Sequence, residues 1–266
     1  MSFWENLVKV VTKYGTSYLR GAGTTLLISL VGTVIGCLIG FAVGAVQTIP
    51  VSKRDNPAKR VLLRIVKAIL YIYVEVFRGT PMIVQAVFIY YGSQVLFNIK
   101  MGMWTAAFFI VSINTGAYMA ETVRGGILSV DPGQNEGAKA IGMTHWQTMR
   151  YVILPQTLRN IVPQIGNNLI INIKDTSVLS VISITDLFFV HKSVVGALYT
   201  YFESATVVMA IYLTMTLVAS RLLRLWETKL DGPQNYDLAT TDTLAFTSGL
   251  HRFQGKGWQQ DEEEQA

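Results

Sequence analysis

The chain has 266 residues, of which 51% are hydrophobic and only 15% charged, and its formal net charge is +5. Soluble domains carry about 25% charged residues, so this composition excludes a soluble fold and predicts an all-α polytopic membrane protein. The single cysteine, Cys37, lies in an apolar run, which excludes an internal disulfide and a cysteine-based metal site. In a membrane protein, the distribution of positive charge among the loops indicates the orientation of the chain. No nucleic-acid partner is expected.

The amino-terminal stretch, residues 1–20, carries aromatic and apolar residues at helical spacing and is expected to be an interfacial segment. A first membrane span is predicted at about 24–47, because no charge occurs between Arg20 and Lys53. Four glycines recur at every fourth position along one face of this span: Gly32, Gly36, Gly40 and Gly44. Such a stripe lets another helix approach closely in lipid, and packing within this chain is favoured over a seam with a second copy.

A basic loop follows, with four cations against one carboxylate: Lys53, Arg54, Lys59, Arg60 and Asp55. The positive-inside rule places this loop in the cytoplasm and the amino terminus outside. Residues 61–97 would reach about 55 Å as one helix, which is too long for a hydrocarbon core of about 30 Å. We expect a mostly interfacial stretch over 61–78, a break near Gly79 and Pro81, and a kinked second span ending near Gly92. Two separate spans are the alternative, and they would reverse the side on which the next long loop emerges.

Three more spans are predicted, at about 103–120, from after Pro155 to about 184, and at about 205–220. Five spans from an outside start place both the polar segment 131–155 and the carboxyl terminus in the cytoplasm.

The domain organisation follows from these spans. The transmembrane domain is expected over 21–230, after the interfacial segment 1–20. Beyond Leu230 the composition turns polar and irregular, so residues 231–266 are expected to form a disordered tail.

The polar segment 131–155 is punctuated by start and turn signals. They are a helix-capping aspartate with a proline behind it, a turn glycine and a second capping pair: Asp131, Pro132, Gly142, Thr144 and Gln147. These signals predict a helix, a turn and a second helix, with Glu136 exposed on the first helix.

Enzyme signatures are missing from the sequence. It has no glycine-rich phosphate loop, its three histidines lack metal-ligand spacing, and no nucleophile–base pair is recognisable. We therefore expect no catalytic residue, no metal and no cofactor.

Polar groups at membrane depth are the remaining functional signal, because they are costly there and usually face a bundle interior or a pathway. The residues expected on a solute pathway are Arg78, Thr80, Gln85, Asn114, Glu121, Lys174, Asp175, Thr176 and Ser177. A zwitterionic solute needs an acceptor for its ammonium group, such as Asp175 or Glu121. It also needs donors for its carboxylate, such as Lys174, Ser177 or backbone N–H groups of a broken helix. The alternative is that Lys174–Asp175 and Glu75–Arg78 are structural pairs.

Two sets of motifs carry a family resemblance. The spacing EGA, three residues, Gly142, nine residues and VILP resembles the EAA loop of bacterial ABC importer permeases, with Gly137 and Val152 in place of an alanine and an isoleucine. The segments VEVFRGTPMIVQAVFIYYG, NTGAYMAETVRGGILSV and GNNLIINIKDTSVLSVI resemble the polar amino acid uptake family of such permeases. The match covers about residues 21–230.

The resemblance implies the ABC importer type I transmembrane fold and a permease subunit for polar amino acids, glutamine or a related amino acid among them. It implies two ABC ATPase subunits that hydrolyse the ATP, a second permease subunit, identical or paralogous, and an extracytoplasmic solute-binding protein. The expected location is the bacterial cytoplasmic (inner) membrane, where the chain is multi-pass and surrounded by lipid. The residues implied to couple to the ATPase are Glu136, Gly137, Ala138 and Gly142.

Other interpretations stay open at this point. The segment 131–155 alone also fits an ordinary surface helical hairpin. A secondary transporter driven by an ion gradient is the functional rival, although no inverted repeat is evident. A membrane-embedded enzyme or assembly factor would need a catalytic constellation that the sequence lacks.

Overall fold

The structure is a computed structural model that describes residues 2–51 and 56–231. Within these ranges every regular element is helical, which confirms the predicted all-α class. Residues Met1–Glu227 form one compact unit. The second unit, Thr228–Ala266, contains the predicted tail, which lies outside the described residues beyond the end of the last helix at Asp231.

The first helix, α1 (Phe3–Thr48), begins at a capping box formed by Ser2 and Glu5 and continues for 46 residues. The interfacial segment 1–20 and the span that follows it thus belong to one continuous helix, and their division at residue 20 stays a prediction. The helix continues through Arg20 because its buried face, which includes Val10, Tyr18 and Ile28, continues across that position.

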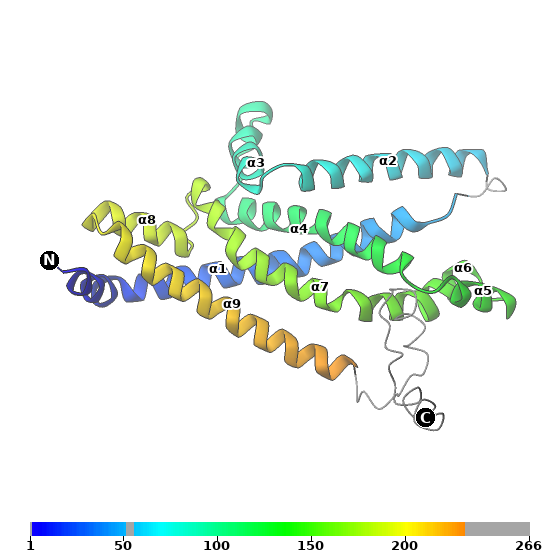
Figure 1. Cartoon of the computed structure of the whole chain (residues 1–266). Coiled ribbons are helices and arrows are strands. Elements are labelled where there is room, and N and C mark those ends of the chain that lie inside the picture. Colours follow the sequence, from blue (N-terminus) through cyan, green and yellow to red (C-terminus); the bar gives the residue numbers. More distant parts are fainter. Residues whose placement is uncertain (1, 52–55, 232–266) are drawn as a thin grey trace, which may run out of the picture. The chain divides into compact units, whose positions relative to one another are not determined.

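The glycine stripe of α1 packs against α4 (Met103–Leu128) of the same chain. A Cβ atom added to Gly36 would lie 2.6 Å from Cβ of Thr115, and one added to Gly40 would collide with Met119. Figure 1 shows α1 and α4 side by side over much of their length. The prediction that the stripe serves packing within the chain is confirmed.

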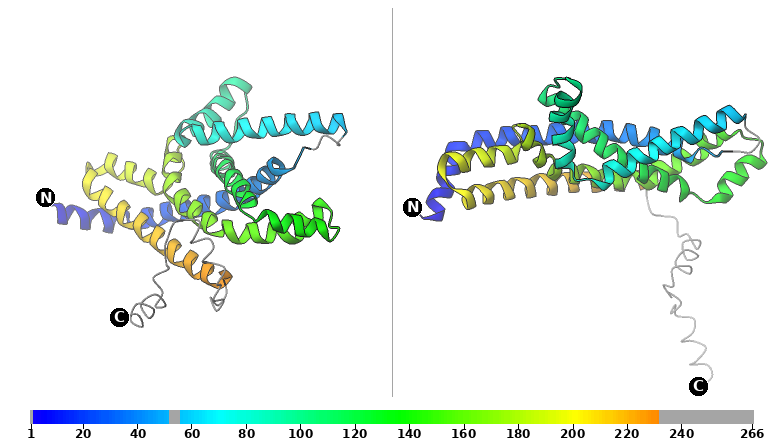
Figure 2. Two further views of the ribbon diagram at one scale, coloured as in Figure 1. Left: turned by 45° about the vertical axis from the view of Figure 1, so that its right-hand side comes forward. Right: turned by 90° about the horizontal axis from the view of Figure 1, so that it is seen from above.

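The predicted break in residues 61–97 is also confirmed. Asn56 accepts a hydrogen bond from the backbone of Ala58 at the start of α2 (Pro57–Gly79), and α3 (Met82–Phe97) follows after two residues. In α2, Val74 packs with Val43 of α1 and Ala120 of α4. The α2 helix therefore lies along the bundle, and α3 turns away from it (Figure 2).

The polar segment forms the predicted helix, turn and helix: α5 (Pro132–Ala140), a turn at Gly142 and α6 (His145–Thr148). A π-helical turn, η1 (Met149–Ile153), then leads into α7 (Leu154–Asp175).

The chain continues through a 3₁₀ helix, η2 (Thr176–Ile182), to α8 (Leu187–Leu198) and α9 (Tyr201–Asp231). The helix α8 was not predicted from the sequence. Its N-cap is Asp186, whose carboxylate accepts hydrogen bonds from the backbone of Phe188 and Phe189. In Figure 1, α5 and α6 lie at one end of the bundle, and α8 lies at the other end with the start of α1.

Two helices in the described ranges are long and apolar enough to cross a membrane, Phe3–Thr48 and Tyr201–Trp226. A third span results if His145–Ile182 and Leu187–Leu198, which are bent by 52°, count as one. The shorter apolar helix Met82–Phe97 falls below the length of a full span. Five spans and their orientation therefore stay a prediction.

Two glycines of α1 provide a test of the α1–α4 contact. We expect Gly40→Ala to destabilise the folded protein by about 1–3 kcal/mol, because the new Cβ would collide with Met119. Gly23→Ala is the matched control, since nothing lies within 4 Å of a Cβ built there. Thermal unfolding in detergent measures both, and equal midpoints for the two variants would contradict the packing role of the stripe.

Candidate functional site

The break between α2 and α3 is closed by two carboxamides. Nε2 of Gln85 donates to the carbonyl oxygens of Phe77 and Thr80, both at 2.9 Å. Nδ2 of Asn114, on α4, donates to Oε1 of Gln85 at 2.9 Å and to the carbonyl of Phe77 at 3.2 Å. Three of the expected pathway residues thus meet here, and their polar groups satisfy the open end of a helix.

A second group of expected residues forms a charged cluster between α2 and α4. Nη1 of Arg78 lies 3.2 Å from Oε2 of Glu121, and Oε1 of Glu121 pairs with Arg124. The Arg78 guanidinium lies 5.7 Å from the centre of the Tyr118 ring. Within the described residues the ion pair of Arg78 is with Glu121, so the alternative Glu75–Arg78 pair is wrong. Because these side chains remain more than a third exposed, the pairs themselves add little stability.

A cavity of about 520 Å³ lies beside this cluster. Its lining includes the basic residues Lys67, Arg78 and Arg124 and the acidic residues Glu75 and Glu121. Both signs of charge are therefore available in one place, which is the requirement for holding a zwitterion.

Lys67 also closes the carboxyl end of α1. Its Nζ donates to the carbonyl oxygens of Gln47 at 2.8 Å and Ile49 at 2.5 Å. A cation at a helix carboxyl terminus is favourable because the last carbonyls are unpaired and carry partial negative charge.

The third group lies where α7 tightens into η2. Lys174 and Asp175 are exposed, and no ion pair joins them within the described ranges. The hydroxyl of Thr176 is buried and donates to the carbonyl of Ile173 at 3.1 Å, so it serves the helix end. Lys174 and Ser177 line a cavity of about 550 Å³.

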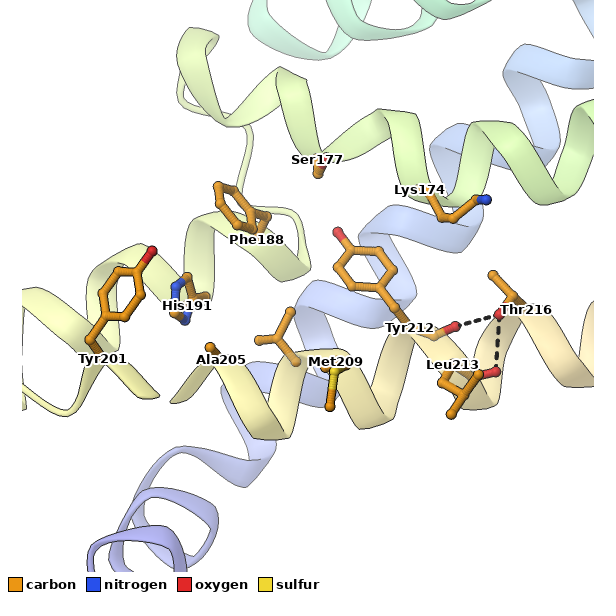
Figure 3. Close-up of a pocket in the computed structure, with 11 residues that line it drawn as sticks. Lys174, Ser177, Phe188, His191, Tyr201, Ala205, Met209, Tyr212, Leu213 and Thr216 are labelled. Atoms are coloured by element: carbon orange, nitrogen blue, oxygen red, sulfur yellow. Dashed lines mark hydrogen bonds between the residues drawn. The ribbon is translucent and has the colours of Figure 1, made fainter. Parts of the chain in front are cut away.

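The remaining lining of this cavity comes from α8 and α9 and is mostly aromatic or apolar, including Phe188, Tyr201 and Tyr212. Figure 3 shows Tyr212 reaching from α9 toward the end of α7, between Phe188 and Lys174. No described hydrogen bond or ion pair joins this third group to the cluster around Glu121.

Two buried polar nodes lie outside the set of expected pathway residues. Nδ2 of Asn172 donates to Oγ1 of Thr33 at 2.7 Å and Oγ1 of Thr115 at 2.9 Å, which ties α7 to α1 and α4. In the other node, Oγ of Ser204 lies 2.7 Å from the Tyr18 hydroxyl and 2.8 Å from Nδ1 of His191.

The Ser204 node joins α1, α8 and α9. Its residues are spread over nearly the whole chain, so no local sequence signal identifies them.

The helix α5 ends in a Schellman motif. The backbone N–H of Met143 donates to the carbonyl of Ala138, and that of Gly142 donates to the carbonyl of Lys139, both at 3.0 Å. Gly142 has a φ of +81°, a conformation that side chains with a Cβ disfavour. The predicted turn glycine is confirmed, and the turn fixes the angle between α5 and α6.

Little of the helix pair α5–α6 is covered by the rest of the chain. Ala138 is only 5% exposed and anchors α5, whereas Glu136 and Gly137 face outward. Large apolar side chains also stand exposed here: Ile141 (80%), Trp146 (69%) and Tyr151 (65%). An uncovered apolar surface of this kind is typical of a protein-binding site.

Comparisons with known proteins agree with the arrangement of the helices. The family described as Binding-protein-dependent transport system inner membrane component matches residues 57–232. The Glutamine transport system permease protein GlnP of Escherichia coli (strain K12) is 37% identical over 213 residues, which is 80% of this chain and 92% of that protein. The Arginine transport system permease protein ArtQ of Bacillus subtilis (strain 168) is 31% identical over 212 residues, 80% of this chain and 91% of that protein.

Solved structures show the same similarity. A chain in the crystal structure of an amino acid ABC transporter with histidines superposes with a TM-score of 0.73 at 36% identity, covering 85% of this chain and 98% of that chain. A chain of the MetNI methionine ABC transporter superposes with a TM-score of 0.62 at 23% identity, covering 81% of this chain and 98% of that chain, and shares the fold.

Two glycines of the α5 turn should respond in opposite ways to alanine. Gly137→Ala meets open space and should stabilise α5 by about 1 kcal/mol. Gly142→Ala also meets open space, but its positive φ should cost about 1–2 kcal/mol. Hydrogen exchange of the amides in 132–143 measures both, as slower exchange in the first variant and faster exchange in the second. Equal rates would contradict the assignment of the turn.

Proposed function

Because this chain belongs to the family of binding-protein-dependent transport system inner membrane components, we propose that it is the transmembrane permease subunit of an ATP-driven importer for polar amino acids. Its relatives are permease subunits of amino acid ABC transporters. We propose that it forms the translocation pathway and couples to ATPase subunits through residues 131–155.

The observation that carries the coupling role is the exposed surface of the helix pair α5–α6. A short capped helix with outward-facing Glu136 stands beside uncovered apolar side chains such as Ile141 and Trp146. In water such a surface is stable only at modest size, and burial in a groove of a partner removes its cost. The coupling residues are Glu136, Gly137, Ala138 and Gly142.

The proposed topology has five spans of the type I importer fold, formed by α1, α2–α3, α4, α7 and α9, with the amino terminus outside. The basic loop around Lys59 supports this orientation, because short basic loops lie in the cytoplasm. The helix pair α5–α6 then lies on the same side, because the spans that precede the loop and the pair, α1 and α4, run in the same direction in this topology. Residues 1–20 are then extracytoplasmic and interfacial, 21–230 contain the transmembrane domain, and 231–266 form a cytoplasmic tail.

The proposed assembly pairs this chain with a second permease subunit, identical or paralogous, two ATPase subunits and an extracytoplasmic solute-binding protein in the bacterial inner membrane. ATP hydrolysis then lies on the partner chains. The charged cavity at Glu121 and the exposed Lys174 and Asp175 offer both charge signs to a zwitterion. The printed substrates of the relatives, glutamine and arginine, favour glutamine or a related amino acid as the solute.

The coupling role is tested with Glu136→Lys in the intact complex. We expect weaker co-purification of the ATPase subunit or hydrolysis without uptake, because the charge reversal falls on the exposed docking face. Lys9→Glu reverses one charge at an exposed position of α1 and should leave both unchanged. Normal uptake by Glu136→Lys would refute the coupling assignment, and uptake that collapses with an ionophore but needs no ATPase would favour a secondary transporter.

The pathway role of Asp175 is tested with Asp175→Asn, which keeps the side-chain shape and removes its charge. We expect impaired uptake with ATPase association intact, because the ammonium group of the solute loses an acceptor. Asp175→Glu should restore part of the uptake. If the Asn variant transports with unchanged kinetics, Asp175 has a structural role only.

A further inference from the structure

One face of α7 is mostly hydrophilic, although the exposed Ile171 also lies on it. Gln156, Asn160, Gln164, Asn167 and Lys174 follow one another at intervals of four, four, three and seven residues, and all are exposed. With 3.6 residues per turn, these intervals place the five side chains on one face. The stripe covers about 27 Å along the helix axis, close to the hydrocarbon thickness of about 30 Å.

The opposite face of α7 is the packed one. Thr157, Ile161, Gly166 and Ile173 are buried there, and Leu169 lines an apolar groove of about 600 Å³ together with α1 and α9 side chains. The polar stripe is therefore largely separate from the packed surface, and within the described residues Asn160 is its one side chain that hydrogen-bonds another helix, at Ser129.

The middle of the stripe has unused hydrogen-bonding capacity. Within the described residues, the side chains of Gln164 and Asn167 have no hydrogen-bond partner, and both are exposed. At the end near α5, Gln156 bonds the carbonyl of Val152 in its own helix, and Asn160 reaches Ser129 at 3.3 Å. Free carboxamides facing hydrocarbon would cost several kcal/mol each, so lipid is not a fitting cover for this face.

We propose that this stripe is the hydrophilic wall along which the amino acid moves through the membrane, with water filling the space beside it. The inference rests on the proposed function and adds the side chains that carry the solute away from Lys174 toward the α5 end. Carboxamides suit this task because each offers donors and an acceptor without net charge. A zwitterion can therefore bind weakly at each step and leave again, as conduction requires.

Cysteine accessibility in the reconstituted full complex tests the proposal. Because Cys37 is the single native cysteine, a Cys37→Ser parent gives a clean background for Gln164→Cys and Asn167→Cys. Leu169→Cys is the matched control, because Leu169 lines the apolar groove on the other side of the same helix. The probe is a charged, membrane-impermeant methanethiosulfonate reagent, applied with and without ATP.

We expect both stripe cysteines to be modified at least about tenfold faster than Leu169→Cys, with uptake lost on modification and glutamine at saturating concentration slowing the reaction. If the stripe cysteines react no faster than Leu169→Cys, both with and without ATP, the proposal is overturned. The stripe would then be assigned to a closed contact between subunits. Uptake by the unmodified complex is measured first. Its absence would refute the proposed function together with the inference, which separates that failure from failure of the stripe alone.

A pair of substitutions gives a second, independent result. Asn167→Leu should slow uptake roughly tenfold, while Asn167→Gln should retain most of it, because only the latter keeps a carboxamide on the wall. The position is exposed, so neither change disturbs the packed face, and equal uptake by both variants would count against the proposal.

Discussion

The close approach of α1 to α4 is the contact on which the other helix packing depends. Membrane helices gain little from the hydrophobic effect, because lipid is as apolar as their own side chains. Their association relies on short-range packing instead, and the glycines of α1 let its backbone lie directly on Thr115 and Met119 of α4. The contact also brings Thr33 and Thr115 within reach of Asn172, so α7 is held by the same pair of helices.

Polar side chains in the bundle serve two different purposes, and burial separates them. Gln85, Asn114 and Asn172 are buried, and each hydrogen-bonds a helix end or a neighbouring polar side chain. Lys174 is exposed and Glu121 is half-buried, although both lie on helices of the bundle. A polar residue type at membrane depth therefore indicates importance without indicating which of the two purposes it serves.

Local signals in the sequence predicted local structure well. The capping residue Asp131, the turn at Gly142 and the break before Pro81 all act within a few residues, so their effects can be read from the sequence. The glycine spacing also identified the packed face of α1. Each of these features depends on backbone conformation or side-chain size at a known position.

Features that depend on distant partners were not predictable in the same way. Arg78 pairs with Glu121, 43 positions away, although Glu75 is nearer in sequence. Tyr18 meets Ser204 across 186 positions, and α8 exists because Asp186 caps it and α1 and α9 cover it. A single sequence contains no direct record of such pairings.

The uninterrupted course of α1 has a consequence for its position in the bilayer. Its uncovered apolar side chains run from Trp4 to Leu38, a distance of about 51 Å along the axis. Even a helix tilted by 40° keeps only about 39 Å of its length within the hydrocarbon. At least about 12 Å of this face must therefore meet headgroups or another protein, and the cations Lys9, Lys13 and Arg20 place that excess at the amino-terminal end. The helix continues unbroken through Arg20. We expect this residue to lie at the depth where the surroundings of α1 change from the headgroup region to hydrocarbon.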